Sequence, residues 1–402
     1  MSKQITLFEG QRLQMSQSIQ LTIDSLNTYG PLHKHWAVAW SGGKDSTALV
    51  TLVLYLIESG KVPRPQSLTV LYADTRQEVV PLAAVAQGLM EELRERGVEV
   101  RTVVAPLDLR FLVNMLGRGV PPPNNATNRW CTRQIKVDPM QAELRRLYEQ
   151  HHEKFLVLTG LRIGESAARD ARISLACSKD DGECGQGWYH KTLPDSLCDR
   201  LSALLHWRVC HVWEWLKHWA PQAEFGDWDT RALAEVYGGE EAEENNARFG
   251  CMGCPLVQED KALKRAVAMH GWDHLAPLLG LQPLYEELRS PHFRLRRVGG
   301  DRRKDGVLVK GQQRLGPLTL EARLHGLERI LKIQAEVNEA AARLGRPGVD
   351  LLNAEEEARI RELIALGTWP KDWEGTEPLG TTLLEKWNED GTVQTLLPLF
   401  NS

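Results

Sequence analysis

The sequence has no long uninterrupted apolar run. None of its 402 residues lie in a segment that approaches the roughly eighteen consecutive apolar residues of a membrane-spanning helix. The first residues, MSKQITLFEGQRLQ, lack the apolar core of a secretory signal peptide. We therefore expect a cytoplasmic protein with no membrane partner.

A large charge of one sign is also missing. The chain carries 49 Lys and Arg residues against 53 Asp and Glu residues, which leaves a formal net charge of -4. Overall charge therefore gives no general attraction to nucleic acid, and such binding would need a local basic patch. The stretch 289–314 has many more cations than acids and is a candidate for that patch, with a solvated basic loop as the alternative.

One glycine-containing stretch stands where a strand should pass into a helix. An apolar run from Ala37 to Trp40 breaks at Ser41-Gly42-Gly43, and an apolar helical pattern follows Asp45. The glycines let the backbone approach a ligand, and the start of the helix offers unpaired N–H donors to an anion. Lys44 can add a charge, and Ser41 and Ser46 can add hydroxyl donors. The pattern predicts a phosphate-binding loop, with a plain strand-to-helix turn as the alternative.

The string Ser41-Gly42-Gly43-Lys44-Asp45-Ser46 resembles the pyrophosphate loop (PP-loop) of the adenine-nucleotide alpha-hydrolase superfamily. That superfamily includes ATP pyrophosphatases, sulfurtransferases and phosphoadenosine phosphosulfate (PAPS) reductases. The string does not fit the other common phosphate loop, in which four residues separate the glycines ahead of Gly-Lys-Ser/Thr. The resemblance implies that ATP and Mg²⁺ bind here, with the alpha-phosphate as the reacting centre and Lys44 and Asp45 in catalytic roles.

The order of the remaining segments predicts the fold. Strands are expected over residues 37–40, 67–72, 98–105 and 154–159, and helices over 11–30, 45–56, 79–96, 230–237, 318–344 and 354–366. This alternation predicts an α/β fold with a doubly wound, mostly parallel sheet and a helical C-terminal region carrying a Cys cluster. A chain of 402 residues is longer than one hydrophobic core usually supports, so more than one structural part is expected. We expect four parts: 1–30 (N-terminal helical extension), 31–204 (nucleotide-binding α/β domain), 205–300 (helical Cys-cluster region) and 301–402 (helical C-terminal region).

Asp74 ends the second predicted strand, within Ala73-Asp74-Thr75. Ligands of open parallel sheets bind beyond the carboxyl ends of the strands, so Asp74 should face the same crevice as the glycine loop. There it could bind magnesium or orient ATP. The alternative is an acidic cap for the following helix.

Two further segments resemble the PAPS reductase branch of the superfamily. Arg129-Trp130-Cys131-Thr132-Arg133-Gln134-Ile135-Lys136 resembles its WCT-x-x-(L/I)-K segment, and 160–169 resembles its G-x-R-x-x-E-S-x-x-R signature. The resemblance implies that Arg133, Lys136, Arg162 and Arg169 bind phosphates and that Glu165 pairs with one of these arginines. Because Cys131 should lie close to the expected crevice, it is a candidate persulfide carrier. A solvated helix face and a structural salt-bridge network are the alternatives.

The seven cysteines are odd in number, which in a reducing compartment favours thiols, metal ligands or redox chemistry over disulfides. Cys251 and Cys254 form a C-x-x-C knuckle, which directs two sulfurs to one centre. Cys177 and Cys184, in a glycine-containing loop, are the best candidates to complete a four-cysteine site. Zinc or a pair of free thiols is the alternative to iron and sulfur.

The segment RFGCMGCPLVQEDKAL resembles a stretch of the DndC-type DNA phosphorothioation sulfurtransferases, whose cysteines bind a 4Fe-4S cluster. Those relatives carry another cysteine just upstream, which this chain lacks. The chain also has no cysteine after Cys254, where assimilatory PAPS reductases place a catalytic one.

The resemblance therefore implies an ATP-dependent sulfurtransferase or ATP pyrophosphatase, with DNA phosphorothioation as the favoured setting and a cysteine desulfurase as sulfur donor. A tRNA thiolase, a PAPS reductase and a non-catalytic ATP-binding subunit of a defence complex are the alternatives.

Overall fold

A computed structural model describes residues 14–125, 129–164, 170–171, 188–190, 196–239, 250–297, 311–312, 315–381, 384–387 and 392–396. Contacts divide the chain into two compact units, each built from separate stretches. Unit 1 comprises Met1–Asp74, Val80–Val104 and Val137–Phe249, and unit 2 comprises Thr75–Val79, Ala105–Lys136 and Gly250–Ser402. The division into four parts stays a prediction.

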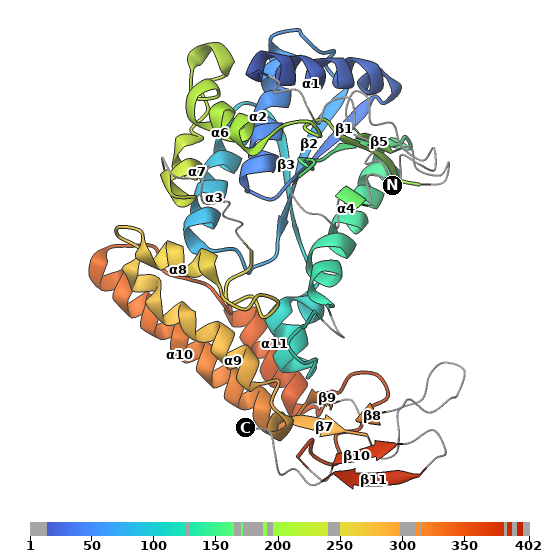
Figure 1. Ribbon diagram of the computed structural model, residues 1–402, viewed down its shortest axis with the longest axis vertical. Coiled ribbons are helices and arrows are strands. Elements are labelled where there is room, and N and C mark those ends of the chain that lie inside the picture. The colour runs from blue at the N-terminus through green and yellow to red at the C-terminus, as the bar shows by residue number, and fades with distance from the viewer. Residues whose placement is uncertain are drawn as a thin grey trace, which may run out of the picture. The chain divides into compact units, whose positions relative to one another are not determined.

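Unit 1 is built on a six-stranded sheet with the order β3-β2-β1-β4-β6-β5 (Figure 1). Its strands are β1 (His35–Trp40), β2 (Ser67–Asp74), β3 (Glu99–Val104), β4 (Phe155–Leu158), β5 (Trp188–His190) and β6 (Cys198–Ser202). Five of them are parallel, and β5 pairs antiparallel with β6 at the edge. The predicted α/β fold with a mostly parallel sheet is confirmed.

Helices cover both faces of this sheet. The helical segments of unit 1 are α1 (Met15–Tyr29), η1 (Gly30–Leu32), α2 (Lys44–Glu58), α3 (Val80–Glu95), α4 (Asp138–His151), α6 (Val209–Glu214), η5 (Trp215–Trp219), η6 (Ala223–Phe225) and α7 (Arg231–Val236). Figure 1 shows α2 and α3 on one face of the sheet and α4 on the other. The helix predicted over residues 11–30 is present as α1, beginning at Met15 in the described part.

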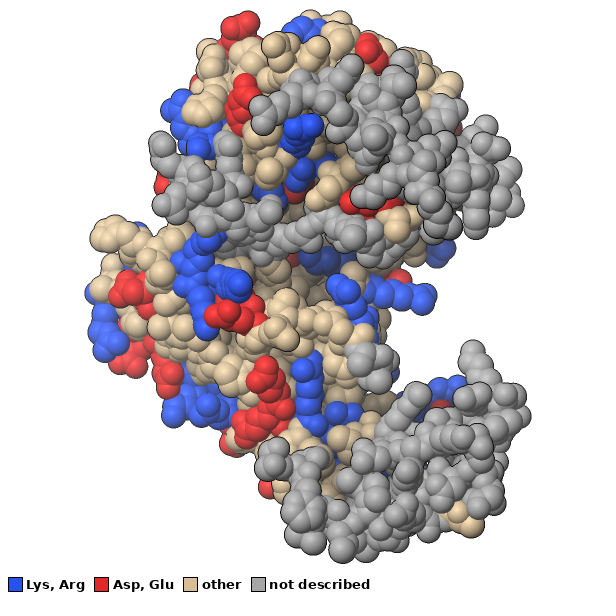
Figure 2. Space-filling model, viewed as in Figure 1, with Lys and Arg blue, Asp and Glu red and all other residues tan. Residues whose placement is uncertain are grey.

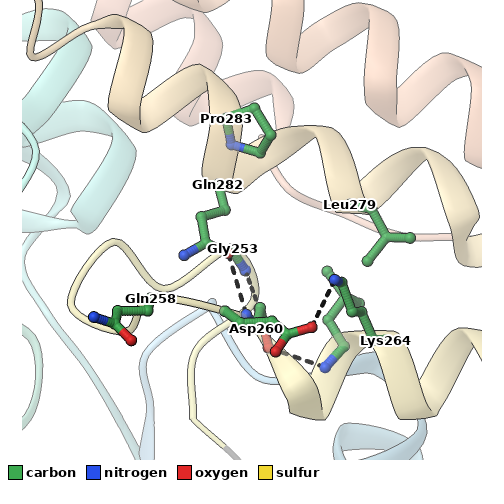
Figure 3. Close-up of a pocket in the computed structure, with 9 residues that line it drawn as sticks. Gly253, Gln258, Asp260, Lys264, Leu279, Gln282 and Pro283 are labelled. Atoms are coloured by element: carbon green, nitrogen blue, oxygen red, sulfur yellow. Dashed lines mark hydrogen bonds and ion pairs between the residues drawn. The ribbon is translucent and has the colours of Figure 1, made fainter.

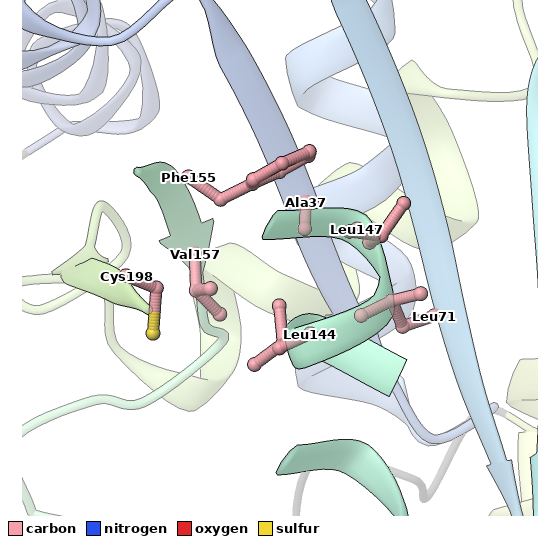
Figure 4. Packing of buried hydrophobic residues seen from close by; sticks show 7 residues of the cluster. All are labelled: Ala37, Leu71, Leu144, Leu147, Phe155, Val157 and Cys198. Atoms are coloured by element: carbon pink, nitrogen blue, oxygen red, sulfur yellow. The ribbon is translucent and has the colours of Figure 1, made fainter. Parts of the chain in front are cut away.

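Side chains alternate between the two faces of β1, as a strand requires. Ala37 packs with Leu71, Phe155 and Val157 of neighbouring strands against Leu144 and Leu147 of α4 (Figure 4). Trp40 is directed to the opposite face, where its Nε1 donates to Thr47 Oγ1 of α2 at 3.0 Å. Ser46 through Ile57 are all buried, so α2 is a central helix. The turn between β1 and α2 is therefore fixed on both sides by packed core elements.

Unit 2 is mainly helical. Its helical segments are η2 (Leu107–Leu109), η3 (Val113–Gly117), η4 (Arg133–Val137, whose last residue begins unit 1), α8 (Lys261–Ala268), η8 (Asp273–Gly280), α9 (Leu281–Glu287), η9 (Pro291–Phe293), α10 (Leu320–Leu344) and α11 (Ala354–Ala365). The strands are β7 (Arg294–Arg296), β8 (Gly311–Gln312), β9 (Leu315–Leu318), β10 (Leu384–Trp387) and β11 (Val393–Leu396). The predicted helical C-terminal region is confirmed, whereas these short strands were not predicted.

The ends of α10 and α11 follow from local sequence. Thr319 Oγ1 accepts the N–H of Ala322 at the start of α10, and Gly345, with φ +60°, ends it. Asn353 and Glu356 form a reciprocal capping box at the start of α11. In the part of the chain that the structure describes, no helix has the length and apolar character needed to cross a bilayer.

Candidate functional site

The predicted phosphate loop is the turn between β1 and α2. Gly42 has a φ of +70°, and a Cβ at this position would lie 2.8 Å from the Cβ of Ala86. Both the backbone angle and the lack of space therefore require glycine here. Gly43 is the residue that precedes the first turn of α2. The loop thus presents the N-terminus of a long buried helix, the geometry that binds anions.

The two serines of the loop bind each other and the backbone. Ser46 Oγ donates to the carbonyl of Gly43 at 3.1 Å and accepts the N–H of Ser41 at 3.2 Å. The hydroxyl oxygens of Ser41 and Ser46 are 3.1 Å apart. These contacts close the loop on itself, so the serines fix its shape. Their predicted role as donors to phosphate stays a prediction.

The end of β4 lies against the same loop. A Cβ on Gly160 would be 2.8 Å from the carbonyl oxygen of Asp45 and 3.0 Å from the nitrogen of Ser46. The carboxyl ends of β1 and β4 therefore meet at the loop. This is the edge at which open parallel sheets bind ligands.

Replacing Gly160 with alanine should displace the loop. We expect a loss of about 10- to 100-fold in the turnover proposed below, because small displacements of a positioning element cost that much. Gly88→Ala in α3 is the matched control, since a Cβ there meets nothing within 4 Å. Steady-state kinetics of both variants check the prediction, and equal activities would contradict it.

Asp45 joins two cations. Its Oδ1 accepts from Arg162 Nε at 2.6 Å, and its Oδ2 lies 3.3 Å from Lys44 Nζ. Arg162 is only 5% exposed, and its Nη1 also donates to the carbonyl of Trp207 at 3.3 Å. Sequence reasoning predicted all three as site residues but not this pairing. The other predicted partners at this position, Glu165 and Arg169, lie outside the described residues.

Lys44 is nearly buried, and Tyr237 lies beside it. The Lys44 ammonium is 5.4 Å from the centroid of the Tyr237 ring. Burial raises the pKa of Tyr237, and the backbone N–H of Lys44 bonds to its hydroxyl. Tyr237 was missed by sequence reasoning, because no motif marks it.

Asp74 ends β2, which is parallel to β1. It is partly exposed, and it lies at the same carboxyl edge of the sheet as the loop. Its role towards magnesium or ATP stays a prediction.

The C-x-x-C knuckle belongs to unit 2 and has a well-defined turn. Gly253 has a φ of +60°, and a Cβ there would lie 2.5 Å from the Cβ of Leu281. Its N–H donates to Asp260 Oδ2 at 2.7 Å, while Asp260 Oδ1 accepts the N–H of Leu263 and so caps α8 (Figure 3). One buried carboxylate therefore fixes both the turn between the two thiols and the following helix.

Both thiols of the knuckle have raised pKa values. Burial is the main cause that raises the pKa of Cys251 to about 12; Lys136 opposes it, and Glu78, Cys254 and Cys131 add to it. Burial likewise raises the pKa of Cys254, with Cys131 again among the contributing groups. Cys131 was predicted as a sulfur carrier apart from the metal ligands. Cys131 belongs to the same unit as Cys251 and Cys254, and its role as a sulfur carrier stays a prediction.

The described residues do not complete a metal site. Within them, no group of three or more His, Cys, Asp or Glu side chains could hold a metal ion. The predicted ligands Cys177 and Cys184 lie outside the described residues. Thiolates are ligands of both zinc and iron-sulfur clusters, and a bound cation would favour the thiolate form of Cys251 and Cys254. These two side chains could therefore supply two of the ligands. The iron-sulfur cluster and its zinc alternative stay predictions.

The remaining predicted cations lie in unit 2. Arg133 is exposed and Lys136 is partly exposed on η4. The preceding Trp130 stacks on Phe111 with a centroid distance of 5.3 Å and donates to the carbonyl of Pro121 at 3.0 Å. The start of η4 is therefore anchored by an aromatic contact, while Arg133 is accessible.

The basic stretch 289–314 is only partly available for binding. Arg294 and Arg296 of β7 are only 8% and 5% exposed. These two residues therefore belong neither to a solvated loop nor to a nucleic-acid-binding surface, the two interpretations of this stretch. Burial lowers the pKa of Arg294 to about 10. On the face drawn in Figure 2, Lys and Arg side chains of described residues lie among Asp and Glu side chains. Residues 298–310 lie outside the described residues.

Comparison with known families agrees with the geometry of unit 1. Residues 35–220 match the phosphoadenosine phosphosulfate reductase domain. This match spans the sheet, the PP-loop and Arg162. The match agrees with the predicted resemblance to the PAPS reductase branch over these residues, which make up somewhat less than half of the chain, and it points to a nucleotide-using enzyme domain.

Individual relatives are more distant. An uncharacterized protein of Methanocaldococcus jannaschii is 25% identical over 232 residues, which are 58% of this chain and 38% of that protein. The chain therefore spans well under half the length of that relative.

Two crystal structures of Candida glabrata FMN adenylyltransferase, one with FMN and an ATP analogue, align with 54% of the chain at 15% identity. They are covered over 60% and 58% of their lengths, with TM-scores of 0.32 and 0.30. Scores this low carry no argument about this chain.

Proposed function

We propose that the protein is an ATP-dependent sulfurtransferase or ATP pyrophosphatase. The observation that carries the proposal is the loop from Ser41 to Ser46, closed by its own serines and flanked by the charge group of Lys44, Asp45 and Arg162. ATP would bind there with its phosphates at the N-terminus of α2. Mg²⁺, near Asp74, would neutralise phosphate charge when bound.

The reaction follows from this placement. An acceptor oxygen attacks the alpha-phosphorus of ATP, the bond to the beta-phosphate oxygen breaks, and pyrophosphate leaves. A sulfur nucleophile then attacks the adenylated acceptor and displaces AMP, which carries away the acceptor oxygen. Lys44, Arg162 and the loop N–H groups lower the barrier by positioning the phosphates and stabilising charge on the leaving pyrophosphate.

DNA phosphorothioation is the favoured setting. Its support is the resemblance of the RFGCMGCP segment to DndC-type sulfurtransferases and the presence of Cys131, Cys251 and Cys254 in the same unit. In this setting Cys131 carries, as a persulfide, sulfur delivered by a cysteine desulfurase. The outer sulfur attacks the adenylated acceptor, and an added dithiol reductant then breaks the S–S bond to Cys131, which leaves the sulfur on the acceptor and the thiol free. Arg133, Lys136 and Arg169 bind phosphates of ATP or DNA.

One set of assays tests this function against its alternatives. The purified protein receives ATP, a desulfurase with cysteine, and either DNA or tRNA, and both pyrophosphate and acceptor-bound sulfur are measured. Sulfur in DNA with one pyrophosphate per event supports the proposal, whereas sulfur in tRNA indicates a tRNA thiolase. Sulfite released from PAPS without pyrophosphate identifies a PAPS reductase, the alternative that the family match favours. Binding of ATP without any turnover indicates a non-catalytic subunit.

The cysteine ligands make a separate prediction. Anaerobically purified protein should be brown with absorbance near about 400 nm, as iron-sulfur proteins are. Cys251→Ser and Cys177→Ser should each bleach it, because each removes a proposed ligand. Cys210→Ser is the control, since Cys210 is exposed. Colourless protein that contains zinc would contradict the prediction. Cys131→Ser should leave the colour unchanged, because Cys131 is the proposed sulfur carrier and not a proposed ligand.

A further inference from the structure

Tyr237 lies at the start of α2, although it is far from the loop in sequence. It directly follows α7 and is 3% exposed. Its hydroxyl oxygen would be 3.5 Å from a Cβ placed on Gly43. The backbone N–H of Lys44 bonds to this hydroxyl, and the ammonium of Lys44 lies over the ring at 5.4 Å. One side chain thus contacts both the backbone and the charge of the same loop residue.

The position of Tyr237 is set by elements outside the loop. Its ring meets that of Trp213, which is fully buried, edge to face at 5.0 Å. Its backbone N–H donates to the carbonyls of Leu233 and Ala234 at the end of α7. These contacts hold the Tyr237 side chain in place independently of the loop, so Tyr237 can in turn fix the position of the loop.

Tyr237 contacts two groups of Lys44 that α2 does not fix by itself, the backbone N–H and the side-chain ammonium. The Lys44 N–H is among the first N–H groups of α2, which have no partner within the helix. The lysine side chain is flexible, and an aromatic face attracts its ammonium and restricts it. Between the Tyr237 ring and the Asp45 carboxylate, the charge of Lys44 is kept at the loop.

We propose that Tyr237 is a positioning residue of the nucleotide loop: its hydroxyl fixes the first turn of α2, and its ring restrains the Lys44 ammonium beside Asp45 before the nucleotide binds. The expected effects on KM and kcat rest on the proposed function, whereas the positioning of Lys44 by Tyr237 does not. Tyr237 acts through Lys44 and contacts no substrate.

Two variants separate the hydroxyl from the ring. Tyr237→Phe removes only the hydroxyl, and Tyr237→Leu removes both features. Tyr55→Phe is the matched control, because Tyr55 is a buried tyrosine of α2 whose hydroxyl accepts from Lys61, away from the loop. Three quantities are measured for each: amide hydrogen exchange of Lys44 in the ligand-free protein, affinity for inorganic pyrophosphate, and KM and kcat with ATP.

The expected pattern is a split between KM and kcat. In Tyr237→Phe, exchange at Lys44 should speed up about three- to tenfold and KM should rise by a similar factor, the usual effect of one hydrogen bond. Its kcat and its unfolding midpoint should match those of Tyr55→Phe. Tyr237→Leu should also lower kcat, because Lys44 loses its ring contact.

The outcomes keep the two proposals apart. Unchanged exchange and unchanged KM in Tyr237→Phe overturn the positioning role, even in a protein that releases pyrophosphate. Wild-type protein that binds neither ATP nor pyrophosphate overturns the proposed function instead, and the exchange rates of Lys44 then decide the role of Tyr237 alone.

Discussion

Asp45→Ala is expected to lower kcat/KM for pyrophosphate release by about two to three orders of magnitude, the loss typical of removing one preorganised electrostatic group. The carboxylate accepts from Arg162 Nε at 2.6 Å and lies 3.3 Å from Lys44 Nζ. Both cations are nearly buried, so alanine leaves two charges without their counterion. We expect both side chains to leave their positions at the loop.

Three further variants test whether the loss in Asp45→Ala comes from the missing charge. Lys44→Ala should abolish pyrophosphate release as well, because it removes the charge itself. Asp45→Asn retains the shape but not the charge and should give an intermediate loss. Glu58→Ala at the other end of α2 is exposed and should be without effect. Unchanged pyrophosphate release in Asp45→Ala and Lys44→Ala would remove the loop from the mechanism.

The elements around the loop could be predicted because their sequences are locally consistent. β1 is an apolar run, α2 is apolar on nearly all sides, and glycines mark the turn between them. β6 was missed because it reads Cys-Asp-Arg-Leu-Ser. Its buried Asp199 is satisfied by His33 Nε2 at 2.9 Å and by the hydroxyl of Tyr189 at 3.3 Å. These hydrogen bonds from residues distant in sequence allow the polar strand to be buried. The local pattern of apolar residues gives no information about such partners, so the strand could not be predicted from it.

In the candidate site, too, contiguous motifs could be predicted from the sequence, whereas contacts between residues remote in sequence could not. Ser41 through Ser46 form a contiguous motif and could be named from sequence. The pairing of Asp45 with Arg162 joins residues 117 positions apart, and Tyr237 belongs to no motif. Cys131 and the knuckle are likewise remote in sequence, and only the structure shows that they belong to the same unit. Sequence therefore predicts which residues carry charge, and structure assigns their partners.

The largest expected loss of stability comes from an arginine in unit 2 that no motif marks. Arg323 of α10 is fully buried, and its guanidinium donates to the carbonyls of Leu318, Gly117 and Thr368. It also stacks on Trp369 at 4.1 Å. Burial lowers its pKa to about 10, and in the described part of the chain its contacts are carbonyls rather than carboxylates. The side chain therefore joins three separate backbone segments.

Arg323→Met should lower the free energy of unfolding by about 3–5 kcal/mol, because three buried carbonyls lose a charged donor. Part of that loss is offset, since a buried charge is removed as well. Arg343→Met is the control on the same helix: Arg343 has a side chain that is 71% exposed, and its substitution should change stability by less than about 0.5 kcal/mol. Urea unfolding of both variants measures the difference. Equal stabilities would mean that other donors or water replace the guanidinium, and that the three segments are joined by apolar packing alone.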